Sequence, residues 1–365
     1  MVEPDIPALF VFVYNEGTML TAQSIFGTAA EKSASDLHLI VNHRPVLRVG
    51  GDLYDLDKEE IISDSALEKL IRQIVTPEQF ERFRIEKEFD FAYSNDGTRF
   101  RVNLSWEKGH ISMAARTIPQ QIPTMEQLGL PSVVQGFTEL THGLILVTGP
   151  TSAGKSTTLA AMIDDINAKR RLNIITLEDP IEFLFEPRQS IIRQRQLETD
   201  MVSFAEGLKH VLRQDPDVVM VGEMRDLDTI ATTLTLAETG HLVFATLHTF
   251  SAPQTVSRII DVFPPHQQTQ IRLQLAMTLR GVISQQLLPR VGGNLVATRE
   301  ILVNTPACAN LIRENKVEQI KNVIQTSAAI GMTSYAQDLK RLVKEGLIAE
   351  ETAEAYLLAS SETQK

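Results

Sequence analysis

A run of glycine, hydroxyl and lysine residues near the middle of the sequence has the spacing of a phosphate-binding loop. Residues 149–156 read Gly-Pro-Thr-Ser-Ala-Gly-Lys-Ser, which fits the pattern G-x-x-x-x-G-K-[ST]. Backbone N–H groups of such a loop, and the N-terminus of the helix after it, bind phosphate oxygens. Lys155 can reach the β- and γ-phosphates of a nucleotide, and Ser156 can ligate Mg²⁺. The pattern therefore predicts a site for a nucleoside triphosphate and Mg²⁺ formed by Gly149, Pro150, Thr151, Ser152, Ala153, Gly154, Lys155, Ser156 and Thr157.

The residues on either side of this loop predict a strand before it and a helix after it. Residues 144–147 are consecutively apolar, as in a buried strand. After the loop, apolar residues recur at helical spacing at Leu159, Met162, Ile163 and Ile166. The order strand, loop, helix distinguishes a phosphate site from an ordinary glycine turn, which is the alternative interpretation.

Carboxylates follow two other predicted strands and could supply the remaining chemistry of hydrolysis. Glu223 comes directly after the apolar strand 218–221, and ligands of parallel sheets bind at the carboxyl ends of the strands. It is our candidate for polarising the attacking water, and a surface glutamate is the alternative. Asp179 and Glu182 follow strand 173–177 and could hold Mg²⁺ through water, because this cation prefers oxygen ligands. Taken alone, they would be interpreted as a solvated charge cluster.

Two histidines flank a further apolar strand, residues 242–246. We expect His241 and His248 to lie near the edge of the sheet that carries the site. A neutral imidazole there could sense the γ-phosphate or relay a proton to Glu223. Each histidine considered singly is more commonly structural.

Composition limits the classes of protein to which the chain can belong. The 365 residues, of which 43% are hydrophobic and 22% charged, are typical of a globular protein with two or three domains. A net charge of -11 argues against a general nucleic-acid binder, so we expect no nucleic-acid partner. The single cysteine, Cys308, excludes an internal disulfide and a cysteine-based zinc site. The early apolar run 8–14 is too short to span a bilayer and lacks the flanks of a signal peptide, so we expect a cytoplasmic protein.

The first third of the chain predicts a self-contained α+β domain, residues 1–118. The pattern favours helices over 20–32 and 65–74, a strand over 36–41, and hairpins over 45–54 and 89–104 that turn at Gly50-Gly51 and at Asn95-Asp96-Gly97. Three prolines in the next stretch, at positions 119, 123 and 131, indicate a linker over 119–135 with little regular structure. We expect this linker to act as a hinge.

From residue 136 the pattern changes to short apolar strands that alternate with helices. The expected strands are 144–147, 173–177, 218–221 and 242–246. This alternation predicts an α/β fold with a parallel sheet and crossover helices over 136–290. After Gly292-Gly293 we expect a mostly helical carboxy-terminal region, residues 291–365.

Longer motifs resemble those of the secretion ATPase superfamily. Residues 178–183 look like its Asp box, residues 215–226 like its Walker B segment, and residues 239–249 like its His box. Within that superfamily the sequence is most similar to the type IV pilus retraction (twitching-motility) ATPases, over roughly residues 20 to 355. Further matching segments are residues 34–39, 100–103, 116–119, 258–264 and 311–314.

The resemblance implies a homohexameric ring that hydrolyses ATP to drive pilus retraction. It implies a PAS-like amino-terminal domain joined flexibly to a RecA-like P-loop ATPase domain. The implied partner is the inner-membrane platform protein of a pilus machine, which would place the chain at the inner face of the cytoplasmic membrane, peripheral to it. In this family, arginines at the positions of Arg101 and Arg116 come near the nucleotide when the amino-terminal domain closes. Glu223, His241, His248, Asp179 and Glu182 take the family's catalytic, His-box and Asp-box roles.

Two positions depart from the family pattern. Ser152-Ala153 stands where the family usually has Gly-Ser, and a positive φ at Ser152 would cost about 1 kcal/mol. Residues 307–314 read Ala-Cys-Ala-Asn-Leu-Ile-Arg-Glu, so that one arginine of the family's usual Ala-Ile-Arg-Asn-Leu-Ile-Arg-Glu is missing. The direction of the motor is therefore open.

Three alternatives remain at this point. A pilus-extension or type II secretion ATPase would carry an additional amino-terminal domain and commonly a four-cysteine zinc element. A nucleotide-binding regulator would bind ATP without turnover. A nucleic-acid motor would need a basic, aromatic binding stripe, which the acidic sequence does not indicate.

Overall fold

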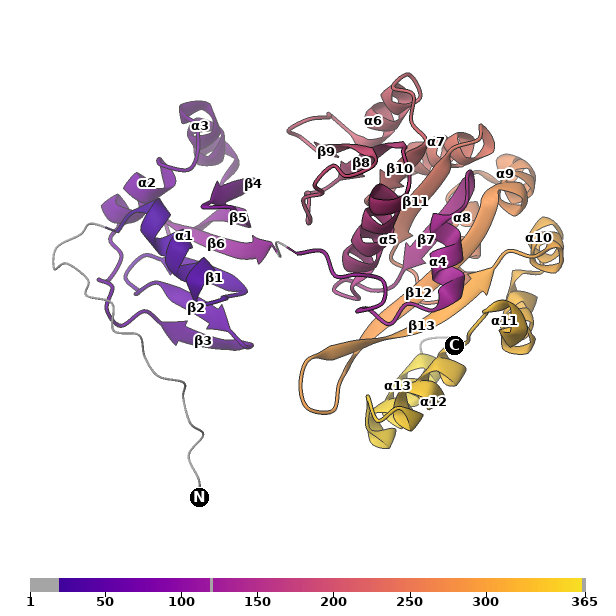
Figure 1. Cartoon of the computed structure of the whole chain (residues 1–365). Coiled ribbons are helices and arrows are strands. Elements are labelled where there is room, and N and C mark those ends of the chain that lie inside the picture. The colour runs from indigo at the N-terminus through magenta and orange to yellow at the C-terminus, as the bar shows by residue number, and fades with distance from the viewer. Residues whose placement is uncertain (1–19, 119–120, 363–365) are drawn as a thin grey trace. The chain divides into compact units, whose positions relative to one another are not determined.

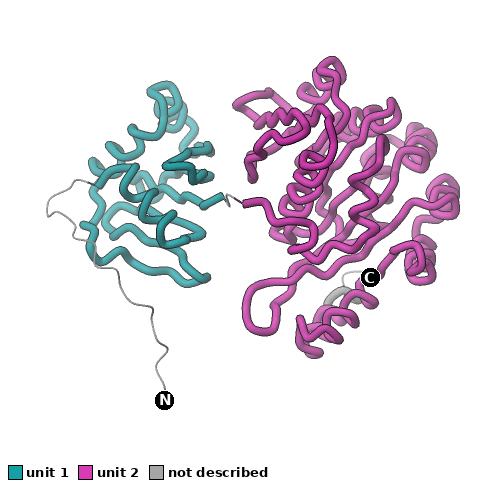
Figure 2. Tube along the Cα trace, in the orientation of Figure 1, with its two compact units in different colours: residues 1–119 teal, residues 120–365 magenta. Residues whose placement is uncertain are grey.

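The described residues, 20–118 and 121–362 of a computed structural model, fold into two compact units (Figures 1 and 2). Unit 1 comprises residues 1–119 and unit 2 residues 120–365. Each unit has its own hydrophobic core, and the core clusters do not share residues. No helix of the described ranges is long and apolar enough to cross a membrane.

Unit 1 is an antiparallel sheet with helices packed on its apolar face. Its strand order is β3-β2-β1-β6-β5-β4, and every neighbouring pair is antiparallel. In β5, Phe100, Val102 and Leu104 are buried and alternate with residues that are at least partly exposed, the period of a strand with one covered face. The elements are α1 (Ala22–Glu31), β1 (Asp36–Ile40), β2 (Val46–Val49), β3 (Asp52–Asp55), α2 (Asp64–Ile71), α3 (Pro77–Glu86), β4 (Glu88–Asn95), β5 (Thr98–Glu107) and β6 (His110–Ile118).

Unit 2 is built on a seven-stranded sheet with the order β13-β12-β7-β11-β10-β8-β9. The strands from β12 to β9 are parallel to their neighbours, whereas β13 runs antiparallel to β12. The strands are β7 (Gly143–Thr148), β8 (Asn173–Glu178), β9 (Ile191–Gln196), β10 (Val218–Val221), β11 (Leu242–Leu247), β12 (Leu279–Pro289) and β13 (Leu295–Val303). The expected α/β fold with a parallel sheet is confirmed.

Helices cover both faces of this sheet (Figure 1). In β7, Leu144 and Leu146 belong to the core on one face, and Ile145 and Val147 to the core on the other. A strand buried on both sides reads as a continuous apolar run, which is why residues 144–147 show no polar alternation. The helices are α4 (Ser132–Thr138), α5 (Lys155–Lys169), α6 (Phe204–Val211), α7 (Leu227–Glu238), α8 (Ala252–Asp261), α9 (Pro265–Thr278), α10 (Pro306–Arg313), η1 (Val317–Gln319), α11 (Ile320–Thr326), η2 (Ala328–Ile330), α12 (Tyr335–Lys344) and α13 (Glu350–Glu362).

The structure differs from the sequence expectation in the linker segment and in three strands of unit 2, because β9, β12 and β13 were not among the expected strands. Residues 121–135, expected as part of a linker, pack onto unit 2 through Met125 and other apolar residues of the segment, and α4 begins at Ser132. Arg299 of β13 also donates to the backbone carbonyl of Leu128, at 2.9 Å. Strand β13 lies where a mostly helical region was expected, because the chain turns at Gly292-Gly293 and pairs back along β12. Residues 119 and 120, the remainder of the expected linker, lie outside the described ranges.

Candidate functional site

The phosphate loop lies between the carboxyl end of β7 and the amino end of α5. Gly154 is the N-cap residue of α5, with a φ of 81°, and no side chain caps this helix end. The first N–H groups of α5 are therefore available to an anion. Gly149 has a φ of +145°, and a Cβ atom there would lie 2.2 Å from the backbone oxygen of Gln285. Glycine is required at this position both by the backbone conformation and by the close approach of β12.

Lys155 is buried, with 9% of its surface exposed, and its ammonium is held by the loop itself. Nζ donates to the carbonyl oxygens of Gly149, at 2.8 Å, and Pro150, at 2.9 Å. Burial lowers the pKa of the Lys155 ammonium, while the carboxylates of Glu182 and Glu223 oppose that shift. A buried cation whose acceptors are two neutral carbonyls fits a loop that binds phosphate, because phosphate oxygens are stronger acceptors.

Ser152, which stands where the family usually has glycine, adopts a left-handed conformation. Its φ is 62°, a region that costs a non-glycine residue about 1 kcal/mol. The next loop residue, Ala153, is buried, with 2% of its surface exposed. The loop of this chain therefore carries local strain that its neighbours must offset.

Glu223 is fixed between the ends of two strands that flank β10. The N–H of Gly222 donates to Leu177 O of β8, at 2.7 Å, and the N–H of Met224 donates to Thr246 O of β11, at 3.1 Å. The Glu223 side chain is 12% exposed. These backbone bonds hold the carboxylate at the carboxyl end of the sheet, where the phosphate loop also lies.

One oxygen of Glu223 has two cationic or potentially cationic neighbours. Arg225 Nε lies 2.7 Å from Oε2, and His248 Nε2 lies 3.5 Å from the same oxygen. His248 directly follows β11, which is the strand between β7 and β10. The structure thus brings together two of the residues that the sequence nominated, Glu223 and His248. Arg225 joins them, although the sequence assigned it no role of its own.

His241 does not belong to this group within one copy of the chain. It lies at the amino end of β11, and His248 lies at the carboxyl end, so the six residues of β11 separate them by about 20 Å. His241 Nδ1 is 3.0 Å from Leu236 O and 3.1 Å from Thr239 Oγ1, contacts that close the turn after α7. The expectation that both histidines lie near the site is therefore wrong for His241.

The three acids around Pro180 lie in different environments. Glu178 is buried, and its Oε1 accepts from Thr176 Oγ1 at 2.6 Å and from Gln194 Nε2 at 3.0 Å. Burial raises the pKa of the Glu178 carboxyl, and these hydrogen bonds oppose the shift. Asp179 and Glu182 are exposed.

The geometry around these acids does not form a preformed metal cage. Across residues 20–118 and 121–362, no group of three or more His, Cys, Asp and Glu side chains is placed to hold a metal ion. Mg²⁺ at a phosphate loop takes ligands from the nucleotide and from water as well as from the protein. Ser156, half-buried at the start of α5, fits that role, and Asp179 and Glu182 would act through water.

Arg101 and Arg116 are cross-strand partners in unit 1. They pair directly in the register of β5 and β6, and both are exposed. Arg116 Nε donates to Oδ1 of the buried Asp36, at 2.8 Å, and Arg101 Nε lies 4.0 Å from Asp90 Oδ1. The register thus places the two arginines on the same face of the sheet, with Arg116 reaching toward β1 and Arg101 toward β4. Their relation to the nucleotide remains a prediction.

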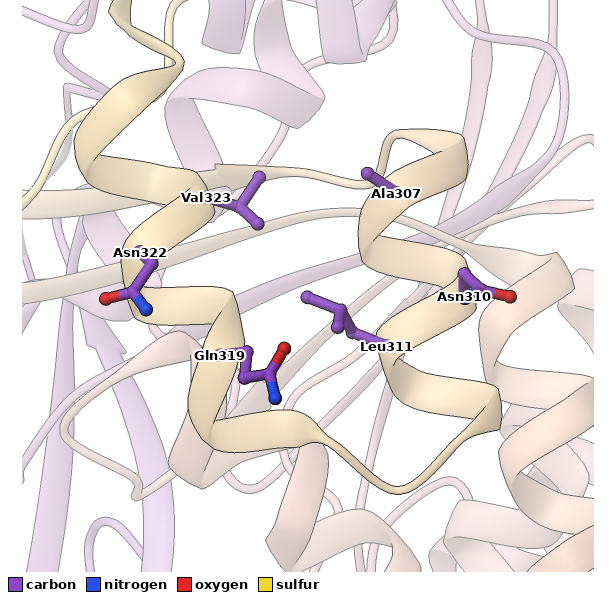
Figure 3. Close-up of a pocket in the computed structure, with 6 residues that line it drawn as sticks. All are labelled: Ala307, Asn310, Leu311, Gln319, Asn322 and Val323. Atoms are coloured by element: carbon purple, nitrogen blue, oxygen red, sulfur yellow. The ribbon is translucent and has the colours of Figure 1, made fainter.

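The altered motif at residues 307–314 forms one wall of a surface groove of about 360 Å³ (Figure 3). Leu311 of α10 and Val323 of α11 point into the space between the two helices, whereas Asn310 points away from it. Cys308, which replaces the isoleucine usual in the family, is buried and contributes to the core of unit 2. The groove is separate from the phosphate loop in sequence and in lining residues.

The family model and the similar proteins indicate the same family. The family described as "Type II/IV secretion system protein" matches residues 19–357. The chain is 44% identical over 326 residues to the type IV pilus retraction ATPase PilT of Pseudomonas aeruginosa. This match covers 89% of this chain and 94% of that protein. It is also 44% identical over 332 residues to a twitching motility protein of Neisseria gonorrhoeae, covering 90% of this chain and 88% of the relative.

Solved structures give the same result. The crystal structure of the pilus retraction motor PilT with bound ADP superimposes with a TM-score of 0.87 at 43% identity, covering 92% of this chain and 96% of that one. The ATPase DotB of Legionella pneumophila superimposes with a TM-score of 0.79 at 28% identity, covering 94% and 98%.

Proposed function

The chain belongs to the Type II/IV secretion system protein family, and from this premise we propose that it is an ATP-hydrolysing motor that powers type IV pilus retraction and twitching motility. One observation carries the proposal. The phosphate loop, His248 and Glu223 follow β7, β11 and β10, which are successive neighbours in the sheet. Three side-by-side carboxyl ends thus hold a phosphate cradle, an imidazole and a carboxylate, the parts that hydrolysis requires.

Each part of this arrangement has a distinct role. The N–H groups at the start of α5 and the ammonium of Lys155 bind the phosphates, and Ser156 ligates Mg²⁺. A magnesium ion held there by Ser156 would supply positive charge beside the β- and γ-phosphate oxygens. Glu223 polarises the attacking water, and His248, close to its Oε2, orients the carboxylate.

The same premise leads to a ring of six copies in which subunits complete one another's sites. A head-to-tail interface that closes on itself gives such a ring. We place the ring on the cytoplasmic side of the inner membrane, where the platform protein of a pilus machine holds it. The PilT and twitching-motility relatives support an association with a pilus machine.

Cells that lack this protein test the function. We expect them to keep surface pili but to lose retraction and twitching, because extension would use a different motor. Tracking of fluorescently labelled pili measures both events in the same cell. Cells complemented with the wild-type chain should recover retraction, and cells complemented with the Glu223→Gln variant should not. Loss of the pili themselves would instead identify an extension motor, an outcome that the altered motif at residues 307–314 makes worth measuring.

The arginine pair of unit 1 gives a separate prediction about closure. We propose that Arg101 and Arg116 contact the nucleotide only when unit 1 swings in, so that ATP arrival favours closure. A charge-assisted hydrogen bond contributes about 1.5–3 kcal/mol, so Arg101→Ala and Arg116→Ala should each lower kcat/KM for ATP by roughly tenfold or more. Steady-state ATPase assays measure this, and a fluorophore pair across the two units reports the nucleotide-dependent distance.

Arg84→Ala is the matched control, because Arg84 is an exposed arginine of the same unit and forms an ion pair with the exposed Glu81, at 3.3 Å. Thermal midpoints are needed as well, since Arg116→Ala leaves the buried Asp36 without that donor. Wild-type turnover together with a wild-type distance change in both alanine variants would show that the arginines do not sense nucleotide.

A further inference from the structure

Gln285 lies beneath the phosphate loop on strand β12. In the register of the sheet, β12 runs parallel to β7, and Ser284 pairs with Thr148 at the point where the loop begins. Gln285 is 1% exposed, and it is a polar residue within a strand that is buried on both sides. Its amide must therefore be bonded within the protein, because an unpaired amide at this depth is costly.

Both ends of that amide are bonded to the nucleotide site. Nε2 donates to the backbone carbonyl of Ala153, at 2.7 Å, and Oε1 accepts from Thr158 Oγ1, at 2.9 Å. Ala153 is in the loop, and Thr158 is in the first turns of α5. One side chain thus ties the loop to the helix whose N-terminus binds the anion.

The bond to Ala153 has an electrostatic consequence for the site. A carbonyl oxygen that turned toward the phosphates would repel them, whereas N–H groups attract them. Gln285 holds the Ala153 carbonyl in the protein interior, on the side away from solvent. This matters in this chain because the preceding residue, Ser152, is held in a left-handed conformation that a non-glycine residue disfavours.

The glycines that bound the loop also touch Gln285. A Cβ atom on Gly149 would lie 2.2 Å from its backbone oxygen, and one on Gly154 would lie 3.2 Å from its Nε2. Gln285 therefore contacts the beginning, the middle and the end of the loop.

We propose that Gln285 is a positioning residue for nucleotide binding, which sets the loop conformation in which the N–H groups face the phosphates of ADP and ATP. The proposal rests on the proposed function of the loop as a nucleotide site. Gln285 acts through Ala153 and Thr158 and does not touch the nucleotide. Its removal should therefore weaken ground-state binding of phosphate rather than slow the chemical step.

Calorimetric titration with MgADP tests this with the Gln285→Leu variant, which keeps the approximate volume and removes both hydrogen bonds. We expect the Kd for ADP to rise about tenfold, KM for ATP to rise similarly, and kcat to change less than threefold. The matched control is Gln286→Leu. Gln286 is the next residue of the same strand, points to the opposite face and is half-exposed.

A second variant keeps the test informative if Gln285→Leu does not fold. Gln285→Glu keeps an acceptor for Thr158 and removes the donor to Ala153, so it should also weaken ADP binding, by at least as much. A merely structural role predicts a lower thermal midpoint with an unchanged Kd for ADP, and that result in either variant overturns the proposal. Failure of the wild-type chain to bind MgADP would instead refute the nucleotide site itself.

Discussion

Replacement of Lys155 by alanine is expected to abolish productive ATP binding. The ammonium is buried and is the loop's own cation, and in the structure it is held by Gly149 O and Pro150 O, where a phosphate would compete for it. Two charge-assisted hydrogen bonds to phosphate contribute about 1.5–3 kcal/mol each, so their loss lowers ATP affinity by a factor on the order of 10² to 10⁴. Titration with a nonhydrolysable ATP analogue and an ATPase assay measure the effect.

Lys169 offers a control on the same helix. It lies in the last turn of α5, half-exposed and paired with Asp165 at 2.6 Å, so Lys169→Ala should leave nucleotide affinity unchanged. Thermal unfolding in the absence of nucleotide separates a binding defect from a folding defect, because Lys155→Ala also removes a donor from two loop carbonyls. A folded Lys155→Ala variant that binds the analogue with wild-type affinity would exclude the loop as the ATP site.

The phosphate loop could be predicted from the sequence because its evidence is local. The apolar run of β7, the glycine spacing and the helical period of α5 all lie within residues 143–169. The left-handed conformation at Ser152 was suggested by the family resemblance rather than by the residues themselves, since a position that the family usually fills with glycine commonly needs a positive φ. Strand ends were predictable as well, and this placed Glu223 correctly at the carboxyl edge.

His241 shows where reasoning from neighbouring residues fails. Both histidines flank one strand, and proximity in sequence favoured a shared site. A strand extends its chain, however, so its first and last residues lie at opposite edges of a sheet. The direction of a parallel strand decides which edge carries the ligand, and only His248 follows β11.

Gln285 could not have been found without the fold. It is 132 residues from Ala153 and 127 from Thr158, and its strand reads as an ordinary apolar segment that contains two glutamines. The sequence shows only that a polar residue occupies a position where a buried strand usually has an apolar one. It does not show which residues form hydrogen bonds with that side chain. Strand β13 was missed because three consecutive polar residues, Thr298, Arg299 and Glu300, interrupt its apolar pattern although all three are buried in the fold.

Glu223→Gln is expected to keep nucleotide binding and to lose turnover. The amide is close in shape to the carboxylate, and its oxygen can still accept from Arg225, so the backbone bonds at Gly222 and Met224 should be retained. An amide cannot polarise water as a carboxylate does, and a positioned base contributes roughly 10²–10⁴-fold to the rate. We therefore expect kcat to fall by about that factor, with the Kd for MgADP within threefold of wild type.

Glu238→Gln is the matched control, since Glu238 is an exposed residue at the end of α7 that accepts from Gln274 Nε2, at 2.7 Å. A second experiment uses the same variant to test the ring. Wild-type and Glu223→Gln chains that carry different tags are expressed together, and mixed assemblies are purified through both tags. If each site works alone, ATPase activity falls in proportion to the fraction of variant subunits.

In a closed ring whose subunits complete one another's sites, the activity should fall much more steeply than the variant fraction, because one inactive subunit stalls its neighbours. The turnover of the variant tests the role of Glu223, and the shape of the mixing curve tests the coupling of the subunits. A variant with wild-type turnover rejects Glu223 as the base, whatever the mixing curve. An inactive variant with a strictly proportional mixing curve keeps the chemical assignment and rejects a coupled ring. Light scattering of the same samples, with and without a nonhydrolysable ATP analogue, tells whether a proportional curve arises from uncoupled sites in a hexamer or from monomers.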